Sequence, residues 1–139
     1  MKKYFILLFV VLFQITHAQK ALSSTELEQA KQGYLDMMKS ESYKQIENID
    51  WEFVEKLNGL EIPKEYWPDP ALYLKFISDN FQKTKFKNIG EAENLLNIQA
   101  SLYKKQIADF STLYDLMKNA SVDQLKEILK PETGKIRTK

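Results

Sequence analysis

Apolar residues recur at spacings of three and four along most of this chain, and that period limits what it can fold into. The clearest short example places five apolar residues on one stripe of a helix: Leu27, Ala30, Tyr34, Leu35 and Met38. No run of alternating β-branched residues occurs, and the chain has only 4 glycines. We therefore predict an all-α fold, a small bundle of four to five helices, because stripes this wide need cover from neighbouring helices.

Capping signals predict where the first helices begin and end. Ser23 and Glu26 have the spacing of a capping box, so a helix should start there. Its apolar stripe ends near Ser40 or continues through Tyr43 and Ile46. A second helix is expected from Asp50 to residues 58–59, an Asn-Gly pair that can close a helix in the left-handed conformation.

The middle of the chain contains a proline-rich loop followed by a third helix. Residues 60–68 hold two prolines and should form a loop. Asp69 can cap the helix that follows, and Pro70 fits its first position because a proline lacks the N–H that would be unpaired there. We expect this helix to fade over residues 83–87.

The longest pattern begins after residues 89–90 and predicts one long helix reaching Asn119. Its apolar residues lie seven apart: Leu96, Tyr103, Phe110 and Met117. Gln99 and Gln106 fall on the same stripe and should be polar spots inside or at the edge of the packing.

A short last helix and a tail complete the predicted domain. Ser121 and Gln124 form a second capping box for a helix over residues 122–129, which Pro131 should end. We expect residues 19–130 to be a single helical domain and residues 131–139 to be a flexible basic tail.

The N-terminal residues 1–18 have the three parts of a cleavable signal peptide. Lys2 and Lys3 are basic, residues 4–13 are apolar, and Thr16 and Ala18 suit the cleavage site. In this order of parts the segment resembles bacterial type I signal peptides. The apolar run is too short to span a bilayer, which takes about 20 residues. We expect an exported product, periplasmic or extracellular, without a membrane span after cleavage.

The charge of the mature chain excludes some partners. The 20 Lys and Arg less Lys2 and Lys3 leave 18 basic side chains against 19 acidic ones, a net charge of −1. This balance provides no field to recruit nucleic acid, so we expect none as a partner. The expected partner is a protein or another component of the cell envelope, and the oligomeric state is left open.

The residue types present exclude most familiar catalytic machinery. The chain has no cysteine, its only histidine is His17 in the signal segment, and its only arginine is Arg137 in the tail. Catalytic triads, thiol nucleophiles and the usual zinc sites all need residues that are missing. We therefore expect no catalytic residue, no metal site and no cofactor.

Carboxylates alone would suffice for a glycan hydrolase, which needs a general acid and a second carboxylate. Candidates near aromatic residues are Glu52 and Glu55 beside Trp51, and Glu65 and Asp69 further along. Nothing in the sequence pairs them, and acidic residues near helix starts are common because they favour the helix dipole. We interpret them as solvated or capping residues.

Two segments are candidate binding sites. Residues 81–87 interleave Lys83, Lys85 and Lys87 with aromatic residues, and Phe86 should be exposed if it anchors a partner. The loop pair Tyr66 and Trp67 is the second candidate. For that pair we favour a structural role, pinning the loop onto the bundle.

These exclusions leave a non-enzymatic, exported helical interaction module as the leading interpretation. A carrier of a small apolar ligand is the alternative, because aromatic and methionine-rich stripes could line a pocket. The same stripes occur more often in closed cores.

The signal peptide gives the first prediction. The intact mass of the exported protein should match a chain that begins at Gln19, because the small residues Thr16 and Ala18 place the cut there. A major exported species that retains Met1 would contradict this.

Overall fold

The computed structural model describes residues 20–133. Within this range the secondary structure consists of helices, and no strand is present. The all-α prediction is confirmed for these residues. The predicted signal peptide and residues 134–139 of the predicted tail lie outside them. Between Lys20 and Thr133, no helix combines the length and hydropathy needed to cross a membrane.

The helices are of unequal length, from one turn to six. They are α2 (Ser24–Lys39), α3 (Glu41–Leu57), α4 (Pro70–Asp79), α5 (Ile89–Asp109), α6 (Ser111–Asn119), α7 (Val122–Ile128) and the one-turn α8 (Lys130–Thr133). Two short 3-10 turns, η1 (Lys64–Tyr66) and η2 (Phe81–Lys83), flank α4.

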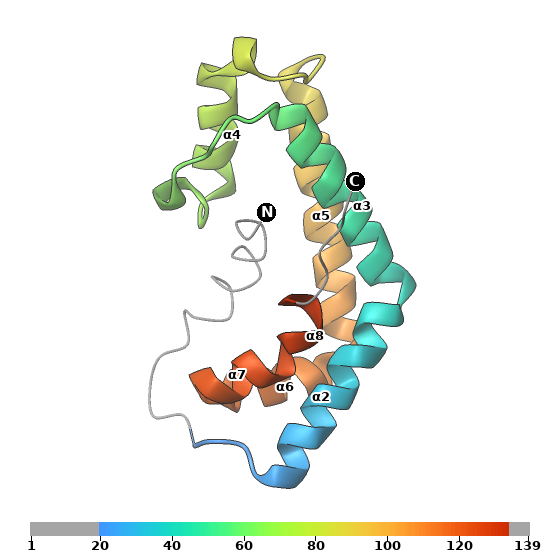
Figure 1. Cartoon of the computed structure of the whole chain (residues 1–139). Coiled ribbons are helices and arrows are strands. Elements are labelled where there is room, and N and C mark those ends of the chain that lie inside the picture. The colour runs from blue at the N-terminus through green and yellow to red at the C-terminus, as the bar shows by residue number, and fades with distance from the viewer. Residues whose placement is uncertain (1–19, 134–139) are drawn as a thin grey trace.

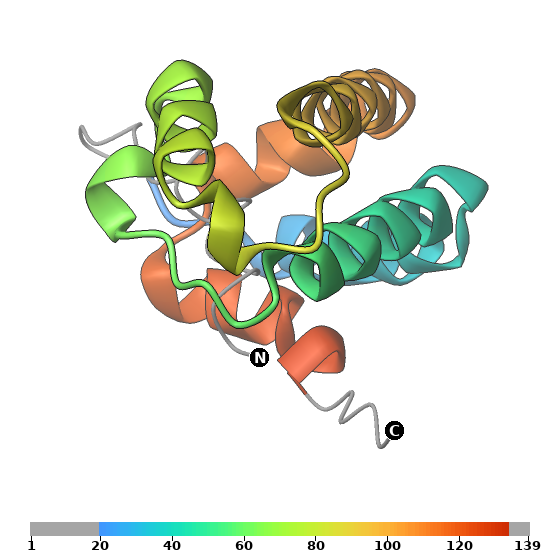
Figure 2. The same cartoon turned by 90° about the horizontal axis from the view of Figure 1, so that it is seen from above.

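Helices α3 and α5 lie side by side and antiparallel, and they form the spine of the molecule (Figure 1). The other helices cover the two ends of this spine. Helix α4 packs beside α5 (Figure 2), whereas α6 and α7 pack on α2 at the opposite end of the spine (Figure 1). An ion pair of 2.6 Å between Lys56 Nζ and Glu91 Oε1 joins α3 to α5 near the α4 end.

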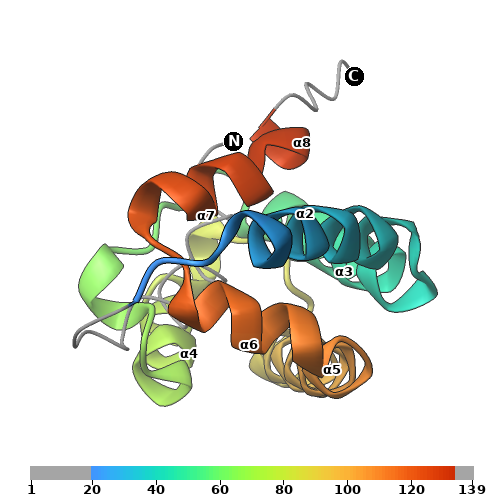
Figure 3. The same cartoon turned by 90° about the horizontal axis from the view of Figure 1, so that it is seen from below.

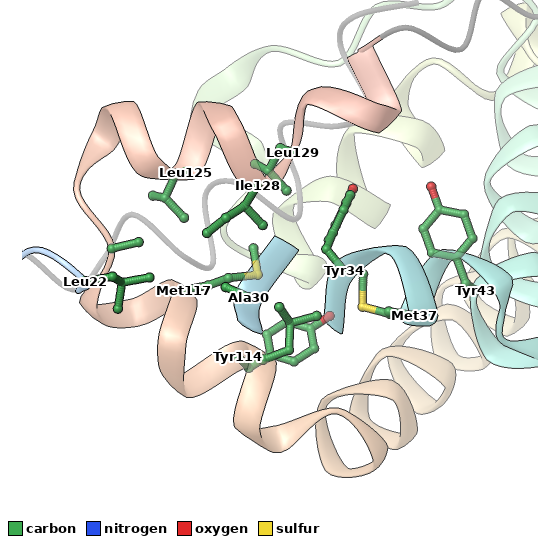
Figure 4. Close-up of a cluster of buried hydrophobic side chains, with 12 residues drawn as sticks. Leu22, Ala30, Tyr34, Met37, Tyr43, Tyr114, Met117, Leu125, Ile128 and Leu129 are labelled. Carbon is green, nitrogen blue, oxygen red and sulfur yellow. The ribbon is translucent and has the colours of Figure 1, made fainter. Parts of the chain in front are cut away.

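Each end of the spine has its own hydrophobic cluster. We call the first the α2–α6–α7 cluster, in which Tyr114 and Met117 of α6 face α2 under the cover of α7 (Figure 4). The second, the α3–α4–α5 cluster, contains Phe53, Tyr73, Ile77, Phe86 and Leu95, among others. The two clusters share no buried residue.

The predicted helix starts at Ser23, Asp69 and Ser121 are confirmed. Both predicted capping boxes form: Ser23 pairs reciprocally with Glu26, and Ser121 with Gln124. Asp69 Oδ1 accepts hydrogen bonds from the first backbone N–H groups of α4, with Pro70 at the first helical position. These local hydrogen bonds fix three helix starts independently of the tertiary packing.

The second helix was predicted to begin at Asp50, and this is wrong. It begins at Glu41, because Ser40 Oγ accepts a hydrogen bond from Tyr43 N and caps the new helix. Asp50 lies inside α3 and faces α5 instead. The predicted end is correct: Asn58 and Gly59 both have positive φ, 54° and 82°.

Helix α4 is also shorter than predicted and does not extend towards residues 83–87. It ends at Asp79, where the Asn80 Nδ2 amide donates to the carbonyl oxygen of Phe76. The same carbonyl also accepts the backbone N–H of Asn80, and the helix ends because Asn80 departs from helical dihedral angles, with φ −114° and ψ 19°. The turn η2 follows at once.

The prediction of one long helix to Asn119 is wrong. The helix breaks at Phe110 (φ −118°, ψ 36°), and α6 leaves in a different direction to pack on α2 (Figure 3). Leu113 of α6 then lies against Gly33 of α2, and the Tyr114 hydroxyl donates to Gln106 Oε1 at 3.1 Å. Tertiary contacts therefore produce the break, and no proline or glycine marks it.

Pro131 does not end the helical structure as predicted. Helix α7 ends at Ile128, and Pro131 is the second residue of α8. A proline is tolerated in the first turn of a helix, where its missing N–H would have no partner. Helical structure thus extends three residues into the predicted tail.

The contact at Gly33 gives a prediction about stability. A Cβ at this position would meet Leu113 at 3.5 Å, an ordinary contact distance. Gly33→Ala should therefore raise the free energy of unfolding by about 0.5–1 kcal/mol, the usual gain inside a helix. Urea denaturation measures the change. Gly59→Ala is the control and should destabilise, because its φ is 82°. Destabilisation by Gly33→Ala would contradict the described contact.

Candidate functional site

The lysine-rich segment 83–87 is placed differently from our expectation. Its three lysines, Lys83, Lys85 and Lys87, are exposed, but Phe86 is only 5% exposed. The Phe86 ring packs at 5.3 Å, centroid to centroid, from that of Phe53. The expected exposure of Phe86 is therefore wrong, and this ring contributes to the α3–α4–α5 cluster.

Backbone hydrogen bonds explain why Phe86 turns inward. The N–H of Lys85 donates to the carbonyl of Lys56 at 2.7 Å, and the N–H of Lys87 donates to Glu91 Oε2 at 2.6 Å. The first bond ties the segment to α3 and the second to α5. The segment thus closes one end of the spine, with its lysine side chains directed outward.

Tyr66 and Trp67 both pack against the α3–α4–α5 cluster. Trp67 Nε1 donates to the carbonyl of Ile62 at 2.9 Å, and the ring of Tyr66 lies 5.3 Å from that of Phe76. Both residues are partly buried. These contacts pin the loop onto the bundle, which is the structural role we favoured for this pair.

The burial of Phe86 generates a prediction. Phe86→Ala should lower the free energy of unfolding by about 3–5 kcal/mol, because it removes a buried ring from contact with Phe53. Chemical denaturation of the mature chain tests this. Lys85→Ala, at an exposed position one residue away, should change stability by less than about 0.5 kcal/mol. Equal effects of the two substitutions would show that the ring is not buried.

A groove at the α2–α6 end of the spine, away from the lysine-rich segment, is a candidate site that the sequence did not predict. It lies between α2 and the junction of α5 with α6 and has a volume of about 400 Å³. Gln29, Gln32 and Asp36 line it from α2, and Asp109, Ser111 and Thr112 line it from the other side. Phe110, Leu113 and Leu116 contribute its apolar surface.

The break at Phe110 and the close approach at Gly33 together shape this groove. The break turns α6 across α2, and Leu113 of α6 packs against Gly33 of α2. No side chain caps the first turn of α6, so the wall at Ser111 and Thr112 presents the start of an uncapped helix. Backbone N–H groups at such a position are available as hydrogen-bond donors.

The groove has two carboxylates at its rim. Asp36 Oδ1 accepts a hydrogen bond from Gln32 Nε2, and Asp109 Oδ2 forms an exposed ion pair with Lys105 at 2.7 Å. Between residues 20 and 133, no three His, Cys, Asp or Glu side chains gather closely enough to hold a metal ion. The rim can therefore offer hydrogen-bond acceptors, but the structure gives it no metal centre.

The carboxylates singled out from the sequence do not form a catalytic pair. Glu52, Glu55 and Glu65 are exposed, and Asp69 is used as the cap of α4. The acidic residue with an unusual environment is Asp50, which the sequence had suggested only as a helix cap. Its position inside α3 could have been anticipated only by knowing that Ser40 caps this helix.

Asp50 belongs to a layer of polar residues between the two hydrophobic clusters. Gln99 Nε2 of α5 donates to Asp50 Oδ1 across the spine. Burial raises the pKa of the Asp50 carboxyl to about 6, the hydrogen bonds from Gln99 and Tyr103 lower it, and the negative charge of Glu47 raises it. The half-buried Gln99 and the buried Gln106 agree with the polar spots predicted inside or at the edge of the packing on this stripe.

Gln106 and Tyr114 extend the same layer towards α6. Gln106 is 1% exposed and accepts the hydrogen bond from Tyr114, while its Nε2 atom has no hydrogen-bond partner in the described part of the chain. Burial raises the pKa of Tyr114 to about 12, and burial followed by the charge of Asp50 also raises the pKa of Tyr103. Both tyrosines are therefore neutral at ordinary pH.

Comparisons with protein-family models, with curated proteins and with solved structures find no match to this chain.

Proposed function

We propose that this protein is an exported, non-enzymatic helical module that binds a partner of the cell envelope in the groove between α2 and α6. It would act in the periplasm or outside the cell, after removal of residues 1–18. The observation that carries this proposal is the groove itself, an open depression of about 400 Å³ lined by both apolar and polar side chains. Such a combination is common at binding sites.

The lining of the groove favours a segment of a partner protein. Phe110 and Leu116 can receive an apolar side chain, and the rim carboxylates of Asp36 and Asp109 can attract a lysine or arginine beside it. Ser111 and Thr112 add hydroxyl groups for hydrogen bonds to the partner's main chain. Lys105 offsets part of the negative charge, so the attraction is local and falls at high salt.

A glycan hydrolase is less well supported, although Asp36 and Asp109 line the same groove. Its general acid must be shielded from water to keep its proton near neutral pH. Both rim carboxylates are exposed, and one of them is engaged by Lys105. The half-buried carboxyl of Asp50 does not line the groove. These observations support binding without catalysis.

A carrier of a small apolar ligand is also less well supported. Such a carrier needs an enclosed apolar hollow. The groove is open and polar at its rim, and both clusters consist of buried side chains packed between adjoining helices. The aromatic stripes thus serve as core, which is their more common role.

The exposed lysines Lys83, Lys85 and Lys87 provide a second candidate surface, for an anionic partner. Hydrogen bonds to α3 and α5 hold the backbone of this segment, so little main-chain order is lost when it binds. Phe86, Tyr66 and Trp67 support this surface from within and do not anchor a partner.

The groove proposal is tested by a blocking variant and a matched control. Thr112→Trp places a bulky ring in the groove, and Ser101→Trp places the same ring at an exposed position of α5 outside it. The mature proteins serve as bait for extracts of their own cell envelope. A partner held by the wild type and by Ser101→Trp should be at least about tenfold weaker with Thr112→Trp, since filling a central pocket removes its anchor.

Two outcomes would contradict the proposal. If Thr112→Trp and Ser101→Trp retain the same partners at equal stability, the groove is not the binding site. If Lys83→Glu with Lys85→Glu removes the partner instead, the lysine surface is the site.

A further inference from the structure

The polar layer lies at the one level of the spine that neither hydrophobic cluster occupies. Asp50, Gln99, Tyr103 and Gln106 are absent from both clusters, although α3 and α5 continue through this level without interruption. The clusters hold the two ends of the helix pair, and its middle combines these polar side chains with the buried Ile46 of α3, which belongs to neither cluster. We call this level, between the two clusters, the joint of the spine.

Contacts in this layer depend on hydrogen bonds that water can replace. The Gln99 side chain bridges to Asp50, and Gln106 is held by Tyr114 with one amide atom left unpaired. Water entering an opened layer would satisfy that amide and would hydrate the carboxylate. Asp50, Gln99 and Tyr103 are only half-buried, and a polar network of this kind is easier to open than apolar packing of the same area.

Among the described residues, each titratable group that acts on the Asp50 carboxyl either disfavours its ionised form or donates a hydrogen bond to it. Glu47, one turn earlier on α3, is acidic, and the Tyr103 hydroxyl of α5 is neutral. Tyr43 of α3 and Tyr114 of α6 lie around Tyr103, and both are buried. Within residues 20–133, no lysine or arginine is among the causes of the shift of the Asp50 carboxyl, so no cation there offsets the ionised form's loss of water.

We propose that this layer is a proton-controlled joint, in which α3 and α5 separate more readily when Asp50 is ionised and pack together when Asp50 is protonated. The joint is distinct from the proposed binding groove but adjoins it. The backbone N–H of Phe110, which lines the groove, donates to the carbonyl of Gln106 in the layer.

The direction and size of the pH effect on opening follow from the difference between the pKa of Asp50 in the closed layer and its pKa in water. The Asp50 carboxyl has a pKa of about 6 in the closed layer, against 3.8 when it is hydrated. The closed layer therefore binds the proton more tightly than the open one, and closure is favoured as the pH falls through about 6. Between pH 5 and pH 7.5 the opening equilibrium should increase about tenfold.

Amide hydrogen exchange of the mature chain, followed by NMR and corrected for intrinsic rates, tests the joint. At pH 7.5 the amides in the middle of α3 and α5 should be less protected than those of both clusters. Their protection should rise about tenfold at pH 5. Asp50→Asn keeps an acceptor for Gln99 without the charge, so its joint amides should show the higher protection at both pH values.

Two controls separate the joint from general effects of charge. Asp36→Asn makes the same change at an exposed carboxylate and should leave the pH dependence intact. Glu47→Gln should reduce the dependence without abolishing it. The proposal is overturned if joint and cluster amides have equal protection, or if Asp50→Asn retains the tenfold change with pH.

Discussion

The packing of α3 along α5 is the interaction on which the rest of the structure depends. Within residues 20–133, these two helices connect the end covered by α4 to the end covered by α2, α6 and α7. The two-ended arrangement also explains why a chain without disulfides can form two clusters. Each cluster closes locally, around its own turn or break, and the spine joins them.

Local chemistry made three helix starts predictable, whereas tertiary contacts determined the break at Phe110. The caps at Ser23, Asp69 and Ser121 each depend on residues within three or four adjacent positions of the sequence. The break at Phe110 arises because Leu113 and Tyr114 find partners on other turns and helices, while the seven-residue apolar spacing continues past it. A periodic pattern reports which residues are buried, but it does not report a change of helix direction.

The candidate sites were less predictable because exposure depends on the fold. Composition identified Lys83, Lys85 and Lys87 as a charged surface, and they are exposed. It also suggested an exposed Phe86, which lies inside because the neighbouring backbone is tied to α3 and α5. The groove had no signal in the sequence, since it requires both the break at Phe110 and the approach at Gly33. Asp50 illustrates the same limit, because one carboxylate can cap a helix or lie within one.

Nuclear Overhauser contacts across the spine are the direct test of the packing of α3 along α5. If α3 lies along α5 with Asp50 against Gln99, the side-chain amide protons of Gln99 should show contacts to the β-protons of Asp50. Contacts between Leu113 and the α-protons of Gly33 should accompany them. An uninterrupted helix through Phe110, with no contacts between the middle of α3 and the middle of α5, would contradict the account.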